Sequence, residues 1–174
     1  MQSDAFTLYK LIILYILDKV DFPLTNAQVS SFILEKEYTN YFSIQQAVSE
    51  LINSELITCE TIRNSSYYRL TSAGRETLEF FNHDISDAIK NDILQYLKEN
   101  KYELREEVST IADYHEEKKD EFIARCMVRE RGSIIVDVSL NVPTEEEASR
   151  ICNSWREKSQ EVYAYLMKTL MSGN

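Results

Sequence analysis

Glycine and proline are scarce in this chain, whose 174 residues include three glycines and two prolines. Loop-built enzyme pockets and disordered segments usually contain many such residues. Their shortage predicts long regular elements joined by short connections. Apolar residues make up 44% of the chain and aromatic residues 11%, so the material for a hydrophobic core is present.

Long apolar runs and paired cysteines are also missing. The run from Leu11 to Leu17 is far shorter than the roughly 20 residues that a membrane-spanning helix needs, and no secretory leader pattern is present. The three cysteines (Cys59, Cys126 and Cys152) are widely spaced, which fits neither a disulfide framework nor a zinc motif. We therefore expect a soluble, cytoplasmic protein that does not enter the membrane.

The motifs of common enzyme chemistries are absent as well. The sequence has no glycine-rich phosphate loop, no Gly-x-Ser-x-Gly and no His-Glu-x-x-His. Neither His83 nor His115 has partners at a metal-ligand spacing, and Glu145–Glu147 is typical of an acidic first turn of a helix. We expect no enzymatic activity, no metal site and no cofactor.

Apolar periodicity predicts three successive helices in the first half, over residues 4–20, 26–36 and 44–54. The first helix is apolar on nearly every side, which predicts burial on every side. Thr25, with Gln28 three residues later, forms a capping-box pattern for the second helix. Ser43 is the predicted N-cap of the third helix.

A β-hairpin and a fourth helix are predicted next. Residues 56–63 are rich in β-branched side chains, Asn64-Ser65-Ser66 has turn chemistry, and residues 67–71 can return as the second strand. A helix over residues 72–83 follows. The predicted order is therefore helix, helix, helix, hairpin, helix.

Two segments within this order carry a family resemblance. The segment Leu70-Thr71-Ser72-Ala73-Gly74-Arg75-Glu76-Thr77-Leu78 resembles the pattern that follows the wing in PadR-like and MarR-like winged helix-turn-helix regulators, and Leu51-Ile52-Asn53-Ser54-Glu55-Leu56-Ile57 resembles their junction between third helix and wing. The whole chain is similar to an uncharacterised family of bacterial proteins that joins an N-terminal winged helix to a small C-terminal α/β domain.

The second half has a different pattern. A helix is predicted over 86–100, followed by strands over 108–115, 121–130 and 134–142, which the short turns make an antiparallel meander. Thr144 is the predicted N-cap of a long helix that runs to about Met171. The expected fold class is α+β, with a winged helix domain over 1–83 and an α/β dimerisation or ligand-sensing domain over 84–174.

The resemblance implies a homodimeric transcriptional regulator that binds double-stranded DNA. In helix-turn-helix proteins the third helix enters the major groove, where amide side chains can pair with adenine. The candidate DNA-binding residues are Ser43, Gln45, Gln46, Ser49 and Asn53 of this helix, with Arg63, Asn64 and Arg69 of the wing.

The charge distribution argues against DNA as a partner. The formal net charge is −10, and no lysine or arginine occurs between Lys36 and Arg63. Phosphate contacts supply most non-specific affinity for DNA, so scattered basic side chains would have to converge on one face; these are Lys10, Lys19, Lys36, Arg63, Arg69 and Arg75. The alternative function is a protein-interaction module that keeps the winged-helix fold without binding DNA.

Five aromatic residues flank the same elements and either close the core beneath the wing or contact a partner; they are Tyr38, Tyr41, Phe42, Tyr67 and Tyr68. The first and last helices are the candidates for a two-fold dimer interface, through Leu11 and Tyr15 in one, and Trp155, Val162 and Leu166 in the other. The alternative is that both helices fill cores within a single chain.

Overall fold

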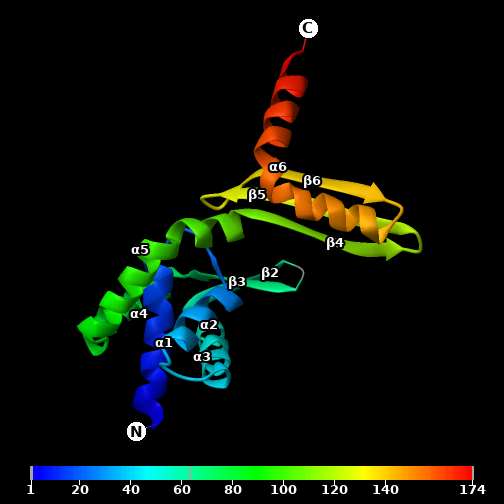
Figure 1. Ribbon diagram of the computed structural model, residues 1–174. Coiled ribbons are helices and arrows are strands. Elements are labelled where there is room, and N and C mark those ends of the chain that lie inside the picture. Colours follow the sequence, from blue (N-terminus) through cyan, green and yellow to red (C-terminus); the bar gives the residue numbers. More distant parts are fainter. Residues whose placement is uncertain (1, 63, 174) are drawn as a thin grey trace. The chain divides into compact units, whose positions relative to one another are not determined.

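The computed structural model describes residues 2–62 and 64–173, which form two compact units. Unit 1 comprises residues 1–105 and unit 2 comprises residues 106–174. Among the described residues the chain has six α-helices and two three-stranded antiparallel sheets, so the predicted α+β class is confirmed (Figure 1). No described helix combines the length and the apolar character required to cross a bilayer.

Unit 1 has the element order predicted from the sequence. Its elements are α1 (Gln2–Asp18), β1 (Leu24–Thr25), α2 (Asn26–Glu35), α3 (Tyr41–Asn53), β2 (Ile57–Ile62), β3 (Ser65–Leu70), α4 (Ser72–Phe81), a short 3₁₀ turn at Asn82–Asp84, and most of α5 (Asp87–Ser109). The strands β2 and β3 form the predicted hairpin, with Ile57 opposite Leu70 and Ile62 opposite Ser65.

Two local features of unit 1 differ from the prediction. The N-cap of α3 is Asn40, whose side chain accepts a hydrogen bond from the Ser43 backbone N–H, so Ser43 lies inside the first turn. The two-residue strand β1 was not predicted; it pairs with β3 and gives the sheet the order β1-β3-β2. The predicted capping box of Thr25 and Gln28 is confirmed by reciprocal hydrogen bonds.

The core of unit 1 is built around α1. All seven residues from Leu11 to Leu17 are buried, as the apolar pattern of this helix predicts. The core also includes Ile44, Val48 and Leu51 on the inner face of α3. Burial of so continuous an apolar surface is the main force that holds the helices and the hairpin together.

The first unit extends beyond the predicted boundary at residue 83. Helix α5 continues without a break to Ser109, nine residues beyond the end that the sequence pattern predicts at residue 100. The Leu104 carbonyl accepts a hydrogen bond from Gln28 Nε2, and Arg105 forms an ion pair with Asp21 at 2.8 Å. These contacts attach most of α5 to the elements before it, so the unit ends at Arg105.

Unit 2 is the predicted meander with a long helix on it. The strands β4 (Thr110–Lys118), β5 (Glu121–Glu130) and β6 (Ser133–Val142) lie in the order β4-β5-β6 and are followed by α6 (Glu145–Met171). The Thr144 hydroxyl accepts a hydrogen bond from the Glu147 N–H, which confirms the predicted N-cap. Trp155 anchors α6 to the sheet, where its indole N–H donates to the Met127 carbonyl at 3.1 Å.

The residues predicted to form a dimer interface occupy different environments. Leu11 and Tyr15 are buried in unit 1, and Trp155 is buried in unit 2. Their side chains therefore fill cores within the chain, the alternative that the sequence left open. Val162 and Leu166 are only half-buried, so the end of α6 is the part of the predicted interface that a second copy can reach.

Among the described residues, four that are not glycine have positive φ angles, between 51° and 59°: Glu37, Glu55, Asp120 and Arg131. Glu37 and Glu55 lie just after the ends of α2 and α3, and Asp120 and Arg131 lie in the turns of the second sheet. This left-handed region is the one that glycine usually occupies after a helix or in a tight turn.

Candidate functional site

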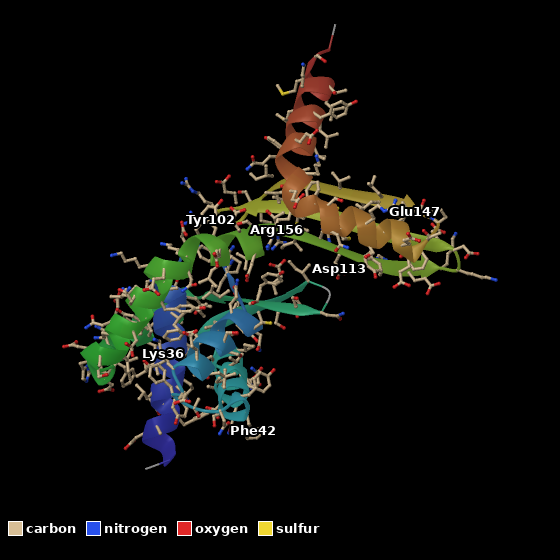
Figure 2. All side chains as sticks on the ribbon, in the orientation of Figure 1. Lys36, Phe42, Tyr102, Asp113, Glu147 and Arg156 are labelled. Carbon is tan, nitrogen blue, oxygen red and sulfur yellow. The ribbon has the colours of Figure 1, made fainter. Side chains whose placement is uncertain are left out.

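The most exposed residues of the middle and end of α3 are polar and uncharged, and they are flanked by Glu50, whose side chain is 45% exposed. Gln46, Ser49 and Asn53 are exposed, whereas the opposite face of the helix is in the core. The phenyl ring of Phe42, in the first turn, is 77% exposed and points outward (Figure 2). This helix can therefore offer amide and hydroxyl groups together with the exposed aromatic rings of Tyr41 and Phe42 at its start.

Gln45 belongs to a different environment from its neighbour Gln46. Its Nε2 donates to Asn26 Oδ1 at 3.0 Å, and its Oε1 accepts from Asn26 Nδ2 at 2.7 Å. Asn26 Nδ2 also donates to the Tyr68 hydroxyl at 2.8 Å. This network joins α2, α3 and β3, so Gln45 positions the helix and is already satisfied within the protein.

Burial raises the pKa of Tyr68 above its ordinary value, because the ionised phenolate would lose its solvation. The hydroxyl therefore stays protonated and available to the network across the physiological range. Ser30 completes the group: its Oγ donates to Asn26 Oδ1 at 3.1 Å. The relative placement of α2 and α3 thus depends on a small polar core as well as on apolar packing.

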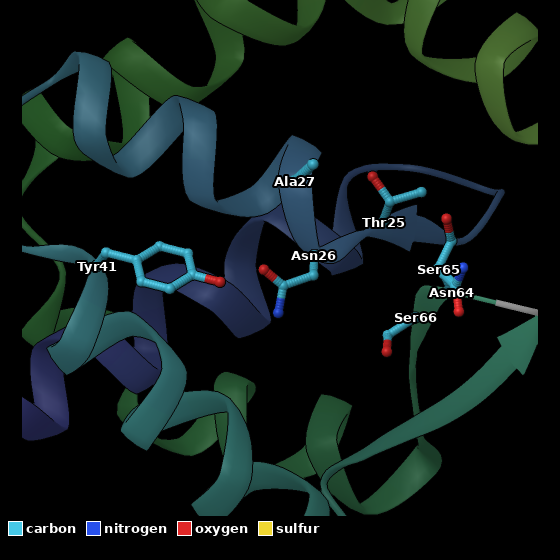
Figure 3. Close-up of a pocket in the computed structure, with 7 residues that line it drawn as sticks. All are labelled: Thr25, Asn26, Ala27, Tyr41, Asn64, Ser65 and Ser66. Atoms are coloured by element: carbon cyan, nitrogen blue, oxygen red, sulfur yellow. The ribbon is translucent and has the colours of Figure 1, made fainter.

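A pocket of about 470 Å³ opens beside this network (Figure 3). It lies between the first turns of α2 and α3 and the turn of the hairpin. Its lining residues are Thr25, Asn26, Ala27, Tyr41, Asn64, Ser65 and Ser66. Among the described lining residues Tyr41 is the one with an ionisable group, and the others offer hydroxyl, amide and methyl groups. The described lining therefore suits a neutral hydrogen-bonding partner better than a bare charge.

The hairpin carries the remaining predicted DNA-binding residues. Asn64 is exposed at the turn and lines the pocket, and Arg69 is half-buried on β3. Arg63 lies outside the residues that the structure describes. The structure thus brings Asn64 to the starts of α2 and α3, while Gln46 and Asn53 are on the outer face of α3.

Five of the basic residues that the hypothesis of DNA binding requires are described by the structure, and three of these five are paired with carboxylates. Lys10 contacts Glu50 at 3.1 Å, and Asp18 contacts both Arg75, at 3.2 Å, and Lys19, at 3.5 Å. Among the described basic residues before residue 83, Lys36 and Arg69 have no such ion pair. A phosphate would have to compete with Glu50 or Asp18 for the paired cations.

The segment Leu70-Thr71-Ser72-Ala73-Gly74 has a structural role. The Thr71 hydroxyl donates to the Glu55 and Leu56 carbonyls at 2.8 and 3.0 Å and accepts from the Gly74 N–H. A Cβ on Gly74 would overlap the Leu56 carbonyl oxygen and the Leu70 side chain. The motif therefore holds the start of α4 against the entry to β2, and only glycine allows this close approach.

The five flanking aromatic residues divide between core and surface. Tyr67 and Tyr68 belong to strand β3 of the hairpin and are buried. Tyr38 is half-buried and donates to Asp92 of α5 at 2.7 Å; burial and this carboxylate raise its pKa. Tyr41 and Phe42 are exposed, so these two are the ones available to a partner. Exposure at this position could not be predicted from spacing, because both residues precede the apolar stripe of α3.

The described residues bring together no group of three or more histidine, cysteine or acidic side chains suited to a metal ion. Residues 9–170 match the family described as Domain of unknown function (DUF4364), which covers nearly the whole of both units. The chain belongs to the DUF4364 family. No curated protein and no solved structure matches the chain. The DUF4364 match spans the α3–hairpin region and the second sheet together, so the family comprises both units.

Proposed function

We propose that the protein is a DNA-binding transcriptional regulator that acts as a homodimer, with unit 1 as a winged helix-turn-helix domain. The observation that carries the proposal is the geometry of α2, α3 and the hairpin. A polar network fixes α3 beside α2, and the hairpin follows α3 directly. This order and connection resemble those of winged-helix DNA-binding domains.

The outer face of α3 supplies the base-reading groups in this proposal. Gln46 and Asn53 are exposed amides of the kind that pair with adenine in the major groove. Arg69 and the hairpin turn supply backbone contacts. Because so few cations are unpaired, we expect binding to depend on salt less steeply than in strongly basic regulators.

The test begins with selection of a DNA duplex from a pool with a random core. Binding of the selected duplex is then titrated at low salt, with fluorescence anisotropy as the readout. We expect the double variant Gln46→Ala/Asn53→Ala to weaken binding of the selected duplex about tenfold or more, since each lost bidentate contact is worth roughly 1–3 kcal/mol. Arg69→Ala is expected to weaken binding to every sequence to a similar degree.

Asn153→Ala and Arg156→Ala are the matched controls, because both residues are exposed on α6 in the other unit and lie before its 160–171 segment. Their affinities should equal that of the unchanged protein. Absence of any enriched duplex, or equal affinities for the α3 variants and these controls, would contradict the proposal.

A protein partner is the second candidate, and the charge around α3 favours it. Glu50 and Glu55 lie in and after this helix, which has no basic residue, and the exposed rings of Tyr41 and Phe42 are at its start. Aromatic residues of this kind are enriched at protein interfaces. A pull-down that recovers one specific protein would support this candidate over DNA if the binding survives nuclease treatment and is lost in Phe42→Ala.

A further inference from the structure

The two edges of the second sheet are protected differently. Edge strand β4 carries Asp113 and the charged end Glu116 to Lys118, where its pairing with β5 is also irregular. Edge strand β6 has ten residues, no proline or lysine, and a single charged residue, Asp137. Charges, prolines and irregularities are the usual means of preventing edge-to-edge pairing. Strand β6 has one such irregularity near its start, where its register with β5 shifts between Ile134 and Val136, but its pairing from Val136 to Val142 is regular. Strand β4, with more charges, is therefore the better protected edge.

The one charge on β6 is already neutralised within the sheet. Arg125 of the neighbouring strand donates to both carboxylate oxygens of Asp137, at 3.0 and 2.7 Å, and holds the pKa of Asp137 below its ordinary value. In an antiparallel sheet about every second residue of an edge strand directs its N–H and C=O groups outward. The β6 edge is therefore an apolar strand with backbone groups ready to pair.

Helix α6 leaves β6 partly uncovered. Tyr114, Ala124 and Leu140 are aligned across the three strands, and the Tyr114 hydroxyl donates to Glu145, so this is the face that α6 covers. Ala124 in the central strand is fully buried, but Leu140 on β6 is 45% exposed. The apolar face of the sheet thus continues beyond the helix to the β6 edge.

The end of α6 lacks a surface to cover. Ser159 is the last buried residue of the helix, and none of the described residues after it is buried. The segment of α6 over residues 160–171, about 18 Å long at 1.5 Å per residue, has exposed apolar side chains at Tyr163, Tyr165, Met167, Leu170 and Met171. Figure 1 shows this red end of α6 leaving the sheet on the side of β6.

We propose that a second copy of this chain pairs its β6 antiparallel with the first, so that two unit-2 sheets form one six-stranded sheet. The two-fold axis passes through the β6–β6 pair, and the 160–171 segment of each α6 covers Leu140 and the neighbouring apolar residues of the other copy. An antiparallel pair of identical strands satisfies two-fold symmetry by itself, because each contact occurs twice.

Charge supports a second copy as the occupant. The chain has a net charge of −10, which disfavours most self-association. The 160–171 segment, however, contains one acid, Glu161, and one base, Lys168, and the β6 charge is paired. The two surfaces that would meet are thus electrically neutral, and each is apolar. This interface does not depend on the DNA-binding proposal, although it would supply that proposal with its dimer.

The experiment combines sedimentation with hydrogen exchange of the full-length protein at about 1 µM and about 100 µM. We expect a dimer at the higher concentration. In the dimer all central β6 amides should be protected, whereas in the monomer protected and rapidly exchanging amides should alternate along β6. Loss of this alternation indicates that the β6 strands pair. A dimer that uses α6 alone would keep the alternating exchange of the monomer.

Leu140→Lys and Leu170→Lys are each expected to raise the dimer dissociation constant about tenfold or more. Within one chain Leu170 is 76% exposed and Leu140 is 45% exposed, so the melting temperature measured at low concentration should change far less than the dimer dissociation constant. Tyr102→Lys, at a residue that is 76% exposed on α5 in unit 1, is the control and should dimerise normally.

A monomer at 100 µM, a dimer with alternating β6 exchange, or dimerisation unaffected by Leu140→Lys would each overturn the proposed interface. These outcomes are separate from the DNA test, because a monomeric Leu140→Lys variant should still bind a single half-site through Gln46. Loss of the dimer with retained half-site binding would support both proposals.

Discussion

The two units of this protein bury their apolar side chains to very different extents. Of the thirty buried apolar residues in the described part of the chain, 24 lie in unit 1 and six in unit 2. Unit 1 encloses one segment of α1, residues 11–17, on all sides. Unit 2 has one helix on one face of a sheet, and a single large anchor, Trp155, holds them together.

This difference indicates how the two units depend on their surroundings. A unit with a large closed core can be stable alone, whereas a small sheet with one covering helix gains much of its stability from further contacts. We therefore expect the denaturant concentration at which unit 1 unfolds to be independent of the protein concentration. Unit 2, in contrast, should become more stable as the protein concentration rises.

The largest effect is expected from Trp155→Ala. The indole is 5% exposed and its N–H is hydrogen-bonded to Met127, so truncation should cost about 3–5 kcal/mol of the free energy of unfolding of unit 2. Amide exchange measured by NMR should show loss of protection in β4–β6 and continued protection in α1–α3. Tyr102→Ala should leave both units unchanged, and simultaneous unfolding of unit 1 would show that the units are not independent.

A smaller effect is expected from Gly74→Ala in unit 1. The added methyl group would overlap the Leu56 carbonyl and the Leu70 side chain, and overpacking of this kind costs about 1–3 kcal/mol. Chemical denaturation, monitored by circular dichroism, should show that unit 1 of the variant unfolds at a lower denaturant concentration. The control is Gly173→Ala, where a Cβ meets nothing within 4 Å; equal stability of the two variants would contradict the structural role of the motif.

The smallest effect is expected from alkaline pH in unit 2. Burial, with a further contribution from Cys152, raises the pKa of the Cys126 thiol to about 11 from its ordinary value of 9.0. The neutral thiol stabilises the folded state below pH 9, and this contribution is lost progressively as the pH rises to about 11. Fluorescence of Trp155, the sole tryptophan, should report the loss.

In Cys126→Ala the loss of stability between pH 9 and 11 should be smaller. Some loss should remain, because the neighbouring carboxylate of Glu145 raises the pKa of Tyr114 as well. A profile between pH 9 and 11 that is identical in the variant and the unchanged protein would show that Cys126 does not contribute.

Much of the fold could be predicted because its signals are local. The capping box at Thr25 and Gln28, the hairpin of β2 and β3 and the cap at Thr144 each depend on residues within a few positions of one another. The extension of α5 to Ser109 could not be predicted in this way. It depends on contacts such as that between Leu104 and Gln28, which are 76 residues apart.

The candidate site was predictable only in part for the same reason. Periodicity placed Gln45 and Gln46 together on the outer side of α3, yet Gln45 turns toward Asn26 and Gln46 remains exposed. Likewise, the apolar stripe of α6 does not reveal that Trp155 is covered by its own sheet whereas Leu170 is exposed. Tertiary partners decide such cases, and a single sequence does not identify them.

The four left-handed residues bear on how far the protein could be made more heat-resistant. Glu37, Glu55, Asp120 and Arg131 adopt a backbone conformation that costs roughly 1–2 kcal/mol for a residue with a side chain and almost nothing for glycine. The chain has three glycines in all, and none of them occupies these four positions. A thermostabilised form for laboratory use could therefore begin with glycine at these positions, which leave both hydrophobic cores untouched.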